Sequence, residues 1–491
     1  MKASPPAASE TGAMLPHERA ARDRMVIGLL LVSAFVVILN ETIMGVALPR
    51  LMESLAITAS AAQWLTTAFM LTMAVVIPIT GMLLQRLNTR PVFILAMSLF
   101  SAGTLISALA PGFAVLLVGR IVQASGTAIM MPLLMTTVMN LVPAETRGRT
   151  MGNISIVISV APAIGPTISG LILSVLDWRW LFLLVLPVAL AALALGAKWI
   201  VNVTVPTTAR IDLFSVLLSA LGFGGLVYGL SQLGENALHA QAVSPLIPLA
   251  IGIVAIAVFV WRQLVLQRED RALLDLRTLA SPTFTIATVM MAILMMAMFG
   301  AFILLPIYLQ TVLHLSTLQT GLLLLPGGLI MGLCAPPVGS LFDRYGPAPL
   351  VIPGSICVAA SLWGLTLVGP HTAVWWLLAA HLLLSVGLAL MFTPLFTVSL
   401  GALPPRLYSH GSAMLGTTQQ VAGAAGTALF VAVMTLESGK SAATGADALT
   451  ALTSGIATAF VYGAVISLGA VAAAFFIRRP KGAASGSIQP H

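Results

Sequence analysis

Glu41 is the residue whose setting most clearly suggests chemistry, because it interrupts an apolar stretch. The stretch begins near Met25 and carries no charge before Glu41, and residues 40–49 at its end read NETIMGVALP. An apolar run of about 20 residues can cross a bilayer as a helix. A carboxylate inside such a run costs about 2.5–3.5 kcal/mol on insertion scales, so it normally faces a protein or water-filled interior. We therefore expect Glu41 to face the inside of a membrane protein.

Arg120 is the natural electrostatic partner for this carboxylate. Glu41 lies eight residues before Pro49, the outer end of its span, and Arg120 lies eight residues after residue 112, where its own span enters from the outside. At about 1.5 Å per helical residue, both lie about 12 Å below the outer surface. They are the only opposite charges so placed in the first half of the chain. A direct or water-bridged pair is expected.

Three roles for this pair stay open. A carboxylate held between burial and a nearby guanidinium can take up and release a proton, so Glu41 can carry the proton while Arg120 biases its release. Glu41 can instead bind a cationic substrate for which the proton competes, or the pair can be purely structural. His381 is a second titratable candidate inside a span. The alternative is that His381 is a hydrogen-bonded histidine of the protein core with no role in proton coupling.

The composition places these residues in a polytopic helical membrane protein. The 491 residues are 59% hydrophobic and 8% charged, with a mean hydropathy of +1.04, whereas soluble proteins carry about 25% charged residues. The net charge of +8 does not indicate nucleic acid, because the basic residues are scattered in short loops. Cys334 and Cys357 lie in apolar spans and suggest neither a disulfide framework nor a metal site. No cleaved signal peptide is expected.

Fourteen apolar spans alternate with short polar breaks. We place them at 25–49, 61–83, 91–110, 113–139, 149–174, 180–200, 213–232, 243–263, 284–312, 319–341, 348–369, 373–397, 411–435 and 454–477. An even number puts both termini on one side. With the termini cytoplasmic, all but four of the 23 Lys and Arg fall on the cytoplasmic side; the exceptions are Arg50, Arg179, Lys440 and the buried Arg120. This bias follows the positive-inside rule.

An internal repeat divides the chain into two halves. Residues 81–88 read GMLLQRLN and residues 339–346 read GSLFDRYG, each after the second span of a six-span block. Parallel repeats of this kind are typical of secondary transporters. The predicted division is a cytoplasmic tail 1–24, a six-helix bundle 25–200, two inserted helices with a linker 201–283, a second six-helix bundle 284–477 and a cytoplasmic tail 478–491.

Residues 25–477 resemble the major facilitator superfamily, in particular its fourteen-span drug:proton antiporter branch. Residues 40–49 are similar to the first-helix motif of that branch, with Asn40 at the usual Asp position, and the Asn-Glu-Thr version is similar to lincomycin-resistance-type exporters. Residues 119–126 resemble the buried-arginine motif of the family. The resemblance implies the superfamily fold with 14 transmembrane helices, two six-helix bundles plus two inserted helices.

The two repeated loops resemble the conserved cytoplasmic loop of the superfamily. The first loop keeps Arg86 and Arg90 but has Gln85 in place of Asp, whereas the second keeps Asp343 and Arg344. An Asp here can cap a neighbouring helix and pair with Arg, which would latch the two halves while the outside is open. Gln85 carries no charge, so the first latch should be the weaker one. Arg86 and Arg90 can alternatively be orientation signals only.

The fifth span matches a signature regarded as typical of antiporters. Its members are Gly152, Ala161, Gly165, Pro166 and Gly170, with Ala161 where Gly is usual. Small residues permit close helix contact and proline permits a kink. The alternative is small-residue packing without any relation to antiport.

Several polar residues in the spans are candidates for lining a substrate cavity with Glu41: Gln63, Trp64, Asn153, Tyr308, Gln310, Gln419 and Gln420. The chain has 23 methionines, five of them in the ninth predicted span (Met290, Met291, Met295, Met296 and Met298). Flexible thioethers suit a pocket that accepts varied apolar shapes. Lipid-facing packing is the alternative.

We therefore expect a proton-coupled antiporter that exports hydrophobic, cationic or amphiphilic drugs from the cytoplasm or inner leaflet by alternating access, with Glu41 as proton carrier. It would be a monomer in a bacterial cytoplasmic membrane, driven by the proton gradient with no cofactor or metal. No ATP-binding Gly-x-x-x-x-Gly-Lys-Ser/Thr loop occurs. The alternatives are a proton-coupled importer or exporter of a specific metabolite, a membrane enzyme, and a receptor or scaffold on a transporter fold.

Overall fold

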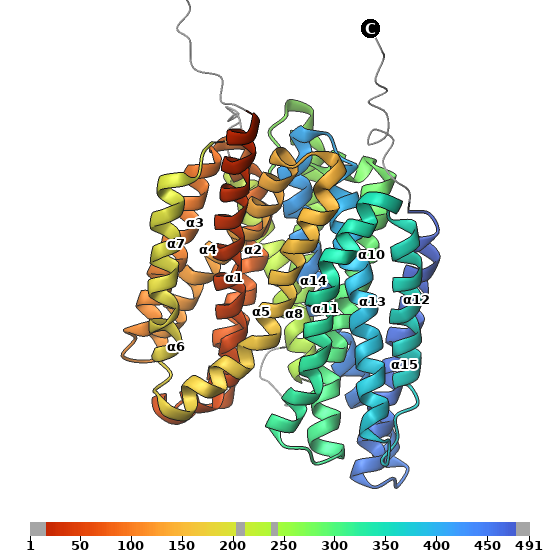
Figure 1. The fold of residues 1–491 in the computed structure, drawn as a ribbon. Helices are drawn as coiled ribbons and strands as arrows, with labels where there is room; N and C mark the ends of the chain where they lie inside the picture. Colours follow the sequence, from red (N-terminus) through yellow and green to blue (C-terminus); the bar gives the residue numbers. More distant parts are fainter. Residues whose placement is uncertain (1–15, 203–211, 237–243, 478–491) are drawn as a thin grey trace, which may run out of the picture.

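The computed structural model describes residues 16–202, 212–236 and 244–477. These residues form an all-helical bundle without strands (Figure 1). The α-helices are α1 Pro16–Leu55, α2 Ala59–Arg86, α3 Thr89–Ala108, α4 Phe113–Leu141, α5 Arg147–Val175, α6 Trp180–Leu183, α7 Val185–Trp199, α8 Leu213–Asn236, α9 Leu246–Leu266, α10 Pro282–Ile307, α11 Thr317–Tyr345, α12 Ala348–Leu365, α13 Val374–Gly401, α14 Tyr408–Ala443 and α15 Ala448–Ala474. Short helical turns are η1 Ala144–Thr146, η2 Gln267–Glu269, η3 Leu276–Ala280, η4 Tyr308–Val312 and η5 Pro405–Leu407.

Fourteen helical segments of the described chain are long and apolar enough to cross a membrane, which confirms the predicted number of spans. One of them combines α6 and α7 over Trp180–Trp199. The largest boundary difference is at α1, which begins at Pro16 rather than near residue 25. Charged residues are compatible with a helix, so hydropathy locates only the membrane-crossing part of α1. The rest of the N-terminal tail, residues 1–15, and the C-terminal tail, 478–491, lie outside the described residues.

Several helices begin at side chains that accept hydrogen bonds from the first backbone N–H groups. Ser281 caps α10, where Pro282 occupies the first helical position. Ser316 and Gln319 form a reciprocal capping box at α11, and Asp447 caps α15. These caps satisfy donors that have no partner within the helix. They therefore set where the spans begin.

The helices gather into two bundles joined by α8 and α9 (Figure 1). Helices α1–α7 pack with one another in the first bundle, and α10–α15 do so in the second. The domain limits drawn from the repeat stay a prediction. We use "terminal face" for the face at which α1 begins and α15 ends, at the top of Figure 1.

The bundles approach most closely where α5 meets α11, near the terminal face. A Cβ added to Gly339 would lie 2.1 Å from the Gly148 carbonyl oxygen, and one added to Gly152 would lie 2.5 Å from the Ala335 carbonyl oxygen. Any side chain at these positions would push the backbones apart. Glycine therefore permits backbone contact between the two bundles.

An ion pair ties the start of α8 to the end of α9. Asp212 accepts hydrogen bonds from Arg262 Nε at 2.6 Å and Arg262 Nη2 at 2.8 Å, and also caps α8 through the Ser215 backbone N–H at 3.0 Å. These bonds, chiefly those from Arg262, hold the pKa of the Asp212 carboxyl well below its usual range. A depressed carboxyl pKa stabilises the fold above the unfolded-state pKa, and this contribution is lost as the pH falls through the folded-state pKa.

Replacing Asp212 with Asn should lower the free energy of unfolding by about 1–2 kcal/mol at pH 7, because a bidentate charged pair is lost. The measurement is the apparent Tm of the purified protein in detergent. The difference from wild type should shrink as the pH is lowered below about 4, because Asp212 then begins to protonate in the unfolded chain while it is still ionised in the folded protein. Glu269→Gln, which breaks the exposed Arg271–Glu269 pair, is the control and should have almost no effect. Equal Tm losses in both variants would contradict this account.

Candidate functional site

Arg120 of α4 is the centre of a polar network inside the first bundle. Its side chain is 1% exposed. Its Nη1 donates to Asn40 Oδ1 of α1 at 3.2 Å and to Gln123 Oε1 at 2.6 Å. Gln123 Nε2 in turn donates to Thr104 Oγ1 of α3 at 2.7 Å. The network thus links three helices around one buried cation.

The guanidinium of Arg120 also stacks on an aromatic ring. Its central carbon lies 4.1 Å from the ring centroid of Phe69 in α2. A cation over an aromatic face is stabilised by the ring quadrupole, by about 2 kcal/mol when desolvated. Neither Phe69 nor the Gln123–Thr104 pair was expected from the sequence. The Gln three residues after Arg120 was visible there, because this spacing places two side chains on the same helix face.

Glu41 lies beside this network without joining it directly. No carboxylate oxygen of Glu41 lies within 4.0 Å of an Arg120 nitrogen, and among the described residues Glu41 has neither an ion pair nor a hydrogen bond. Its side chain is partly exposed, whereas Asn40 is buried. Consecutive helix residues point about 100° apart, so only one of the two can face Arg120. Asn40 makes the direct contact, and the water-bridged form of the Glu41–Arg120 pair stays a prediction.

Helix α5 packs against α1 next to Glu41. A Cβ added to Gly165 would lie 2.3 Å from Thr42 Oγ1, and Ser169 Oγ donates to the Ile43 carbonyl oxygen at 3.1 Å. Of the predicted antiporter motif, Gly152 therefore contacts α11 while Gly165 contacts α1. Ala161 is buried, Pro166 lies within α5, and a Cβ at Gly170 would have no atom within 4 Å.

His381 does not lie near Glu41 and Arg120. It lies on α13 in the second bundle, and its Nε2 is 3.1 Å from the Leu324 carbonyl oxygen of α11. The imidazole is buried and fills the space where a Cβ on Gly327 would be. This setting fits the core-histidine alternative. A role in proton coupling stays a prediction.

The other candidate cavity residues are dispersed. Trp64 is exposed at the beginning of α2, next to Gln63, and stacks on Tyr228 of α8 with ring centroids 5.7 Å apart. Tyr308 is buried and its hydroxyl donates to the Gly369 carbonyl oxygen. The remaining candidates are Asn153 on α5 and Gln310 in η4, both exposed, and Gln419 and Gln420 on α14, both partly buried. The apolar pattern of the sequence places these residues in spans, but it does not show which way their side chains point.

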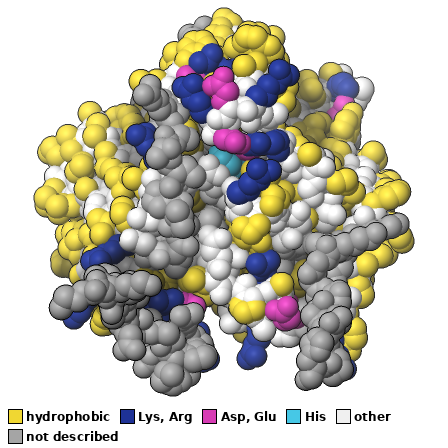
Figure 2. Space-filling model, turned by 90° about the horizontal axis from the view of Figure 1, so that it is seen from above, with side chains coloured by type: hydrophobic (Ala, Val, Ile, Leu, Met, Phe, Trp, Pro, Cys, Tyr) yellow, Lys and Arg dark blue, Asp and Glu magenta, His cyan; other side chains and the backbone are white. Residues whose placement is uncertain are grey.

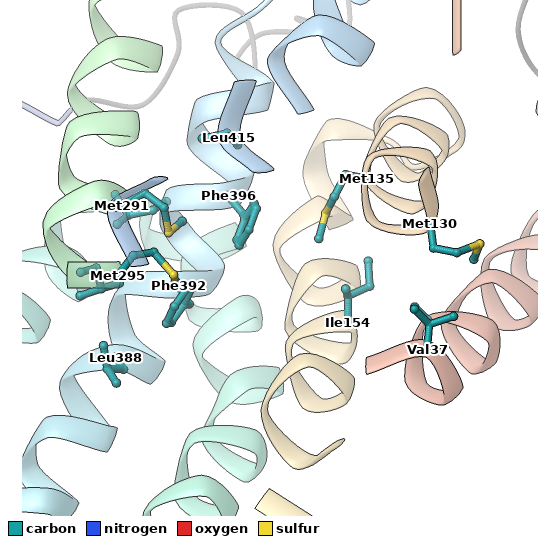
Figure 3. Close-up of a cluster of buried hydrophobic side chains, with 14 of the residues drawn as sticks. Val37, Met130, Met135, Ile154, Met291, Met295, Leu388, Phe392, Phe396 and Leu415 are labelled. Atoms are coloured by element: carbon teal, nitrogen blue, oxygen red, sulfur yellow. The ribbon is translucent and has the colours of Figure 1, made fainter. Parts of the chain in front are cut away.

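Buried apolar side chains of both bundles lie around the middle of the molecule. Figure 3 shows Met135 and Ile154 of the first bundle on the side that faces Phe392 and Phe396 of the second. The methionines Met290, Met291 and Met295 of α10 are buried, so these three do not face lipid. Across the bundles, the hydroxyls of Ser155 and Thr393 lie 2.8 Å apart. The contact between the bundles is thus mostly apolar.

The two repeated loops make different contacts at the terminal face. Asp343 accepts hydrogen bonds from the backbone N–H groups of Gly148 at 2.7 Å and Arg149 at 2.8 Å, and so caps the start of α5 from the opposite bundle. Gln85 instead donates its amide to the Arg406 carbonyl oxygen at 2.8 Å, just before α14. Arg86, Arg90 and Arg344 are exposed. A carboxylate at a helix start interacts with the positive end of the helix dipole, which an amide does only weakly.

Replacing Asn40 with Ala should lower the free energy of unfolding by about 1–3 kcal/mol, because a buried guanidinium N–H loses an acceptor. The measurement is the apparent Tm in detergent. Asn40→Asp is the matched control: it keeps an oxygen at the same place and adds an opposite charge, so its Tm at pH 7 should equal or exceed that of wild type. A loss in Asn40→Asp as large as in Asn40→Ala would contradict the assigned contact.

Comparisons with known proteins agree with this architecture. The family model described as Major Facilitator Superfamily matches residues 30–427. The chain is 41% identical over 463 residues to the lincomycin resistance protein LmrB of Listeria innocua, covering 93% of this chain and 97% of that protein. It is 30% identical to a multidrug resistance protein B homolog of Mycobacterium tuberculosis, covering 86% of this chain and 79% of that protein.

Solved structures share the fold at low sequence identity. The human organic anion transporter MFSD10 aligns with a TM-score of 0.63 at 16% identity, covering 92% of this chain and 100% of that chain. The proton:xylose symporter XylE aligns with a TM-score of 0.62 at 16% identity, covering 92% and 96%. These likenesses concern the fold alone. Together with the family match they confirm the resemblance found in the sequence: the chain belongs to the major facilitator superfamily and is a multi-pass membrane transporter, not an enzyme.

Proposed function

We propose that this transporter exports hydrophobic, cationic or amphiphilic drugs in exchange for protons, with Glu41 as the proton carrier. The observation that carries the proposal is that Asn40 and Gln123 already occupy Arg120, which leaves the partly exposed carboxylate of Glu41 without a partner among the described residues. A carboxylate that no ion pair holds can exchange protons or bind a cation. The drug-resistance names of the relatives support export of drugs.

The terminal face is proposed to be cytoplasmic. Basic residues concentrate there, at the loops after α2, α4 and α11, and the positive-inside rule orients such loops toward the cytoplasm. Figure 2 looks onto this face and shows Lys and Arg side chains spread over it. The membrane is then the bacterial cytoplasmic membrane, with both chain ends inside. One chain supplies both bundles, so a monomer is sufficient.

The proposed cycle alternates the access of Glu41. When the outer side is open, the higher proton concentration there protonates Glu41 and weakens its attraction for a cationic substrate, which leaves. When the cytoplasmic side opens, Arg120 favours the ionised carboxylate, the proton is released inward and a new substrate binds. Proton entry thereby drives substrate exit. No cofactor is required, because the proton gradient supplies the free energy.

The alternative is a proton-coupled importer or exporter of one specific metabolite on the same fold. It uses the same carboxylate but requires a substrate site of fixed polarity. The buried apolar side chains in the middle of the molecule, among them Met135, Met295 and Phe392, favour varied apolar substrates instead.

Replacing Glu41 with Gln should abolish proton-driven transport and leave a weaker substrate binding that no longer depends on pH, because the amide keeps the shape of the side chain but neither titrates nor attracts a cation. The measurement is uptake of ethidium into proteoliposomes under an imposed pH gradient, together with ethidium binding in detergent. Glu53→Gln, which changes an exposed carboxylate farther along α1, is the control and should transport like wild type. Full coupling in Glu41→Gln, or wild-type transport that ignores the gradient, would refute the proposed mechanism.

Asp343 is proposed to keep the terminal face closed by capping α5. Asp343→Ala should weaken this closed state by about 0.5–2 kcal/mol, the usual contribution of a helix cap. The measurement is maleimide labelling of Ala335→Cys, a buried position on α11, in a chain whose two native cysteines are replaced by Ala. Labelling should become faster.

Glu145→Ala provides the control for Asp343→Ala, because Glu145 is an exposed carboxylate in η1 just before α5. It should leave the labelling rate unchanged. Unchanged labelling in Asp343→Ala as well would rule out the latch.

A further inference from the structure

The two bundles meet along two seams on opposite sides of the molecule. One seam lies between α2 and α14, and the other lies between α5 and α11. Each seam pairs one helix of the first bundle with one helix of the second. In the part of the chain that the structure describes, the α2–α14 seam is covered by a further helix, whereas the α5–α11 seam is not.

Helix α8 covers the α2–α14 seam along its length. Far from the terminal face, Tyr228 of α8 stacks on Trp64 of α2. The residue before Tyr228, Val227, forms a buried cluster with Ala74 of α2 and Ala424 of α14. Nearer the terminal face, Leu218 of α8 belongs to a second buried cluster, which includes Met82 of α2 and Ala413 of α14.

The linker after α9 extends this cover to the terminal face. Leu273 and Leu274 of the linker are buried in the same cluster as Leu218. Gln263 of α9 fixes them, because its Oε1 accepts both of their backbone N–H groups, at 2.7 and 3.3 Å. Its Nε2 donates to Ser215 Oγ of α8 at 2.9 Å. The inserted helices and their linker therefore form one continuous cover.

The α5–α11 seam is closed over only part of its length. Close backbone contacts occur near the terminal face, and a Cβ on Gly332 would still lie 2.5 Å from Val160 Cγ2 farther in. Beyond that depth, a Cβ on Gly170 of α5 or Gly321 of α11 would have no atom within 4 Å. Leu171 is 71% exposed and Leu322 is 58% exposed. The helices have separated there, in the half of the molecule away from the terminal face.

The separated part of α5 is the part that contacts α1 next to Glu41. Gly165 packs on Thr42, and Ser169 bonds the Ile43 carbonyl. A molecule passing between α5 and α11 at this depth would therefore arrive beside the carboxylate without crossing the closed part of the seam.

We infer that α8 and α9 seal one seam so that apolar molecules exchange with the bilayer through the other. The α5–α11 seam, in the half away from the terminal face, is the lateral route by which membrane-soluble substrate leaves the region between the two bundles for the outer half of the bilayer. The inference rests on the proposed function, since it assigns a path to the exported substrate. The inference also gives α8 and α9 a role, which is to seal the α2–α14 seam against the bilayer.

The test places a bulky side chain in the seam. Gly170→Trp and Gly321→Trp should fold, because neither new side chain meets a neighbour at its Cβ. In proteoliposomes with an imposed pH gradient, both variants should slow several-fold the transfer of a bisbenzimide dye into the receiving half of the bilayer, measured as the dye fluorescence that a water-soluble quencher on that side can reach. Ethidium is a permanent cation that dissolves poorly in hydrocarbon, so it is not expected to use the lateral route and should be transported at the wild-type rate. Ile253→Trp on the lipid-exposed face of α9 is the control. Wild-type dye transport in both seam variants would overturn the inference.

A second measurement needs binding but no transport, so it separates this inference from the proposed function. Gly321→Cys, in a chain whose native cysteines are replaced by Ala, is labelled with pyrenylmaleimide dissolved in the bilayer. The bisbenzimide dye should slow labelling of Gly321→Cys and leave Ile253→Cys unchanged. Equal labelling with and without dye would overturn the seam route. Protection in a protein that shows no proton-driven transport would instead keep the route and refute the antiport cycle.

Discussion

The need to satisfy a buried cation organises the first bundle. Hydrocarbon supplies no hydrogen-bond acceptor, so a guanidinium within a span requires its partners from neighbouring helices. Arg120 obtains oxygen atoms from Asn40 and Gln123 and an aromatic face from Phe69. Because these partners are neutral, the cation keeps its full charge within reach of Glu41. Had a carboxylate taken the place of Asn40, the charge would have been compensated locally.

The second constraint is how closely two bundles can approach and still move. At the terminal face, Gly148 and Gly339 bring the backbones of α5 and α11 together, and Asp343 caps α5 across the gap. On the opposite seam the equivalent position is Gln85, which contacts a backbone carbonyl. The linker residues Leu273 and Leu274 bury apolar surface there instead. One seam is thus held by a carboxylate at a helix start, the other by a neutral amide hydrogen bond and apolar packing, and these respond differently to water entering the interface.

The sequence predicted the properties that depend on residue type and on position along the chain. It did not predict those that depend on the direction in which a side chain points. The number of spans follows from hydropathy, because a bilayer fixes the length of each apolar run. The depth of Glu41 and Arg120 follows from helical rise, so both were placed in one region. Whether Asn40 or Glu41 contacts Arg120 depends on helix rotation, which the pattern in an apolar span does not determine. The exposure of Asn153 also depends on helix rotation and was not predicted. Phe69 was not predicted because nothing in the sequence distinguishes it from the other Phe residues in the spans.

The inserted helices show why rotation matters more than hydropathy for function. Helix α8 is as apolar as its neighbours, yet it contacts α2 and α14 through buried side chains such as Leu218 and Val227. A helix that contacts both bundles must slide against at least one of them when the bundles move. Apolar side chains permit such sliding, because dispersion contacts are non-directional and are replaced by equivalent ones after a small shift. The polar contacts of the pair, Asp212–Arg262 and Gln263–Ser215, instead join α8 to α9. The directional bonds therefore hold the cover together as a unit, and the non-directional contacts let that unit remain on a seam whose two sides move.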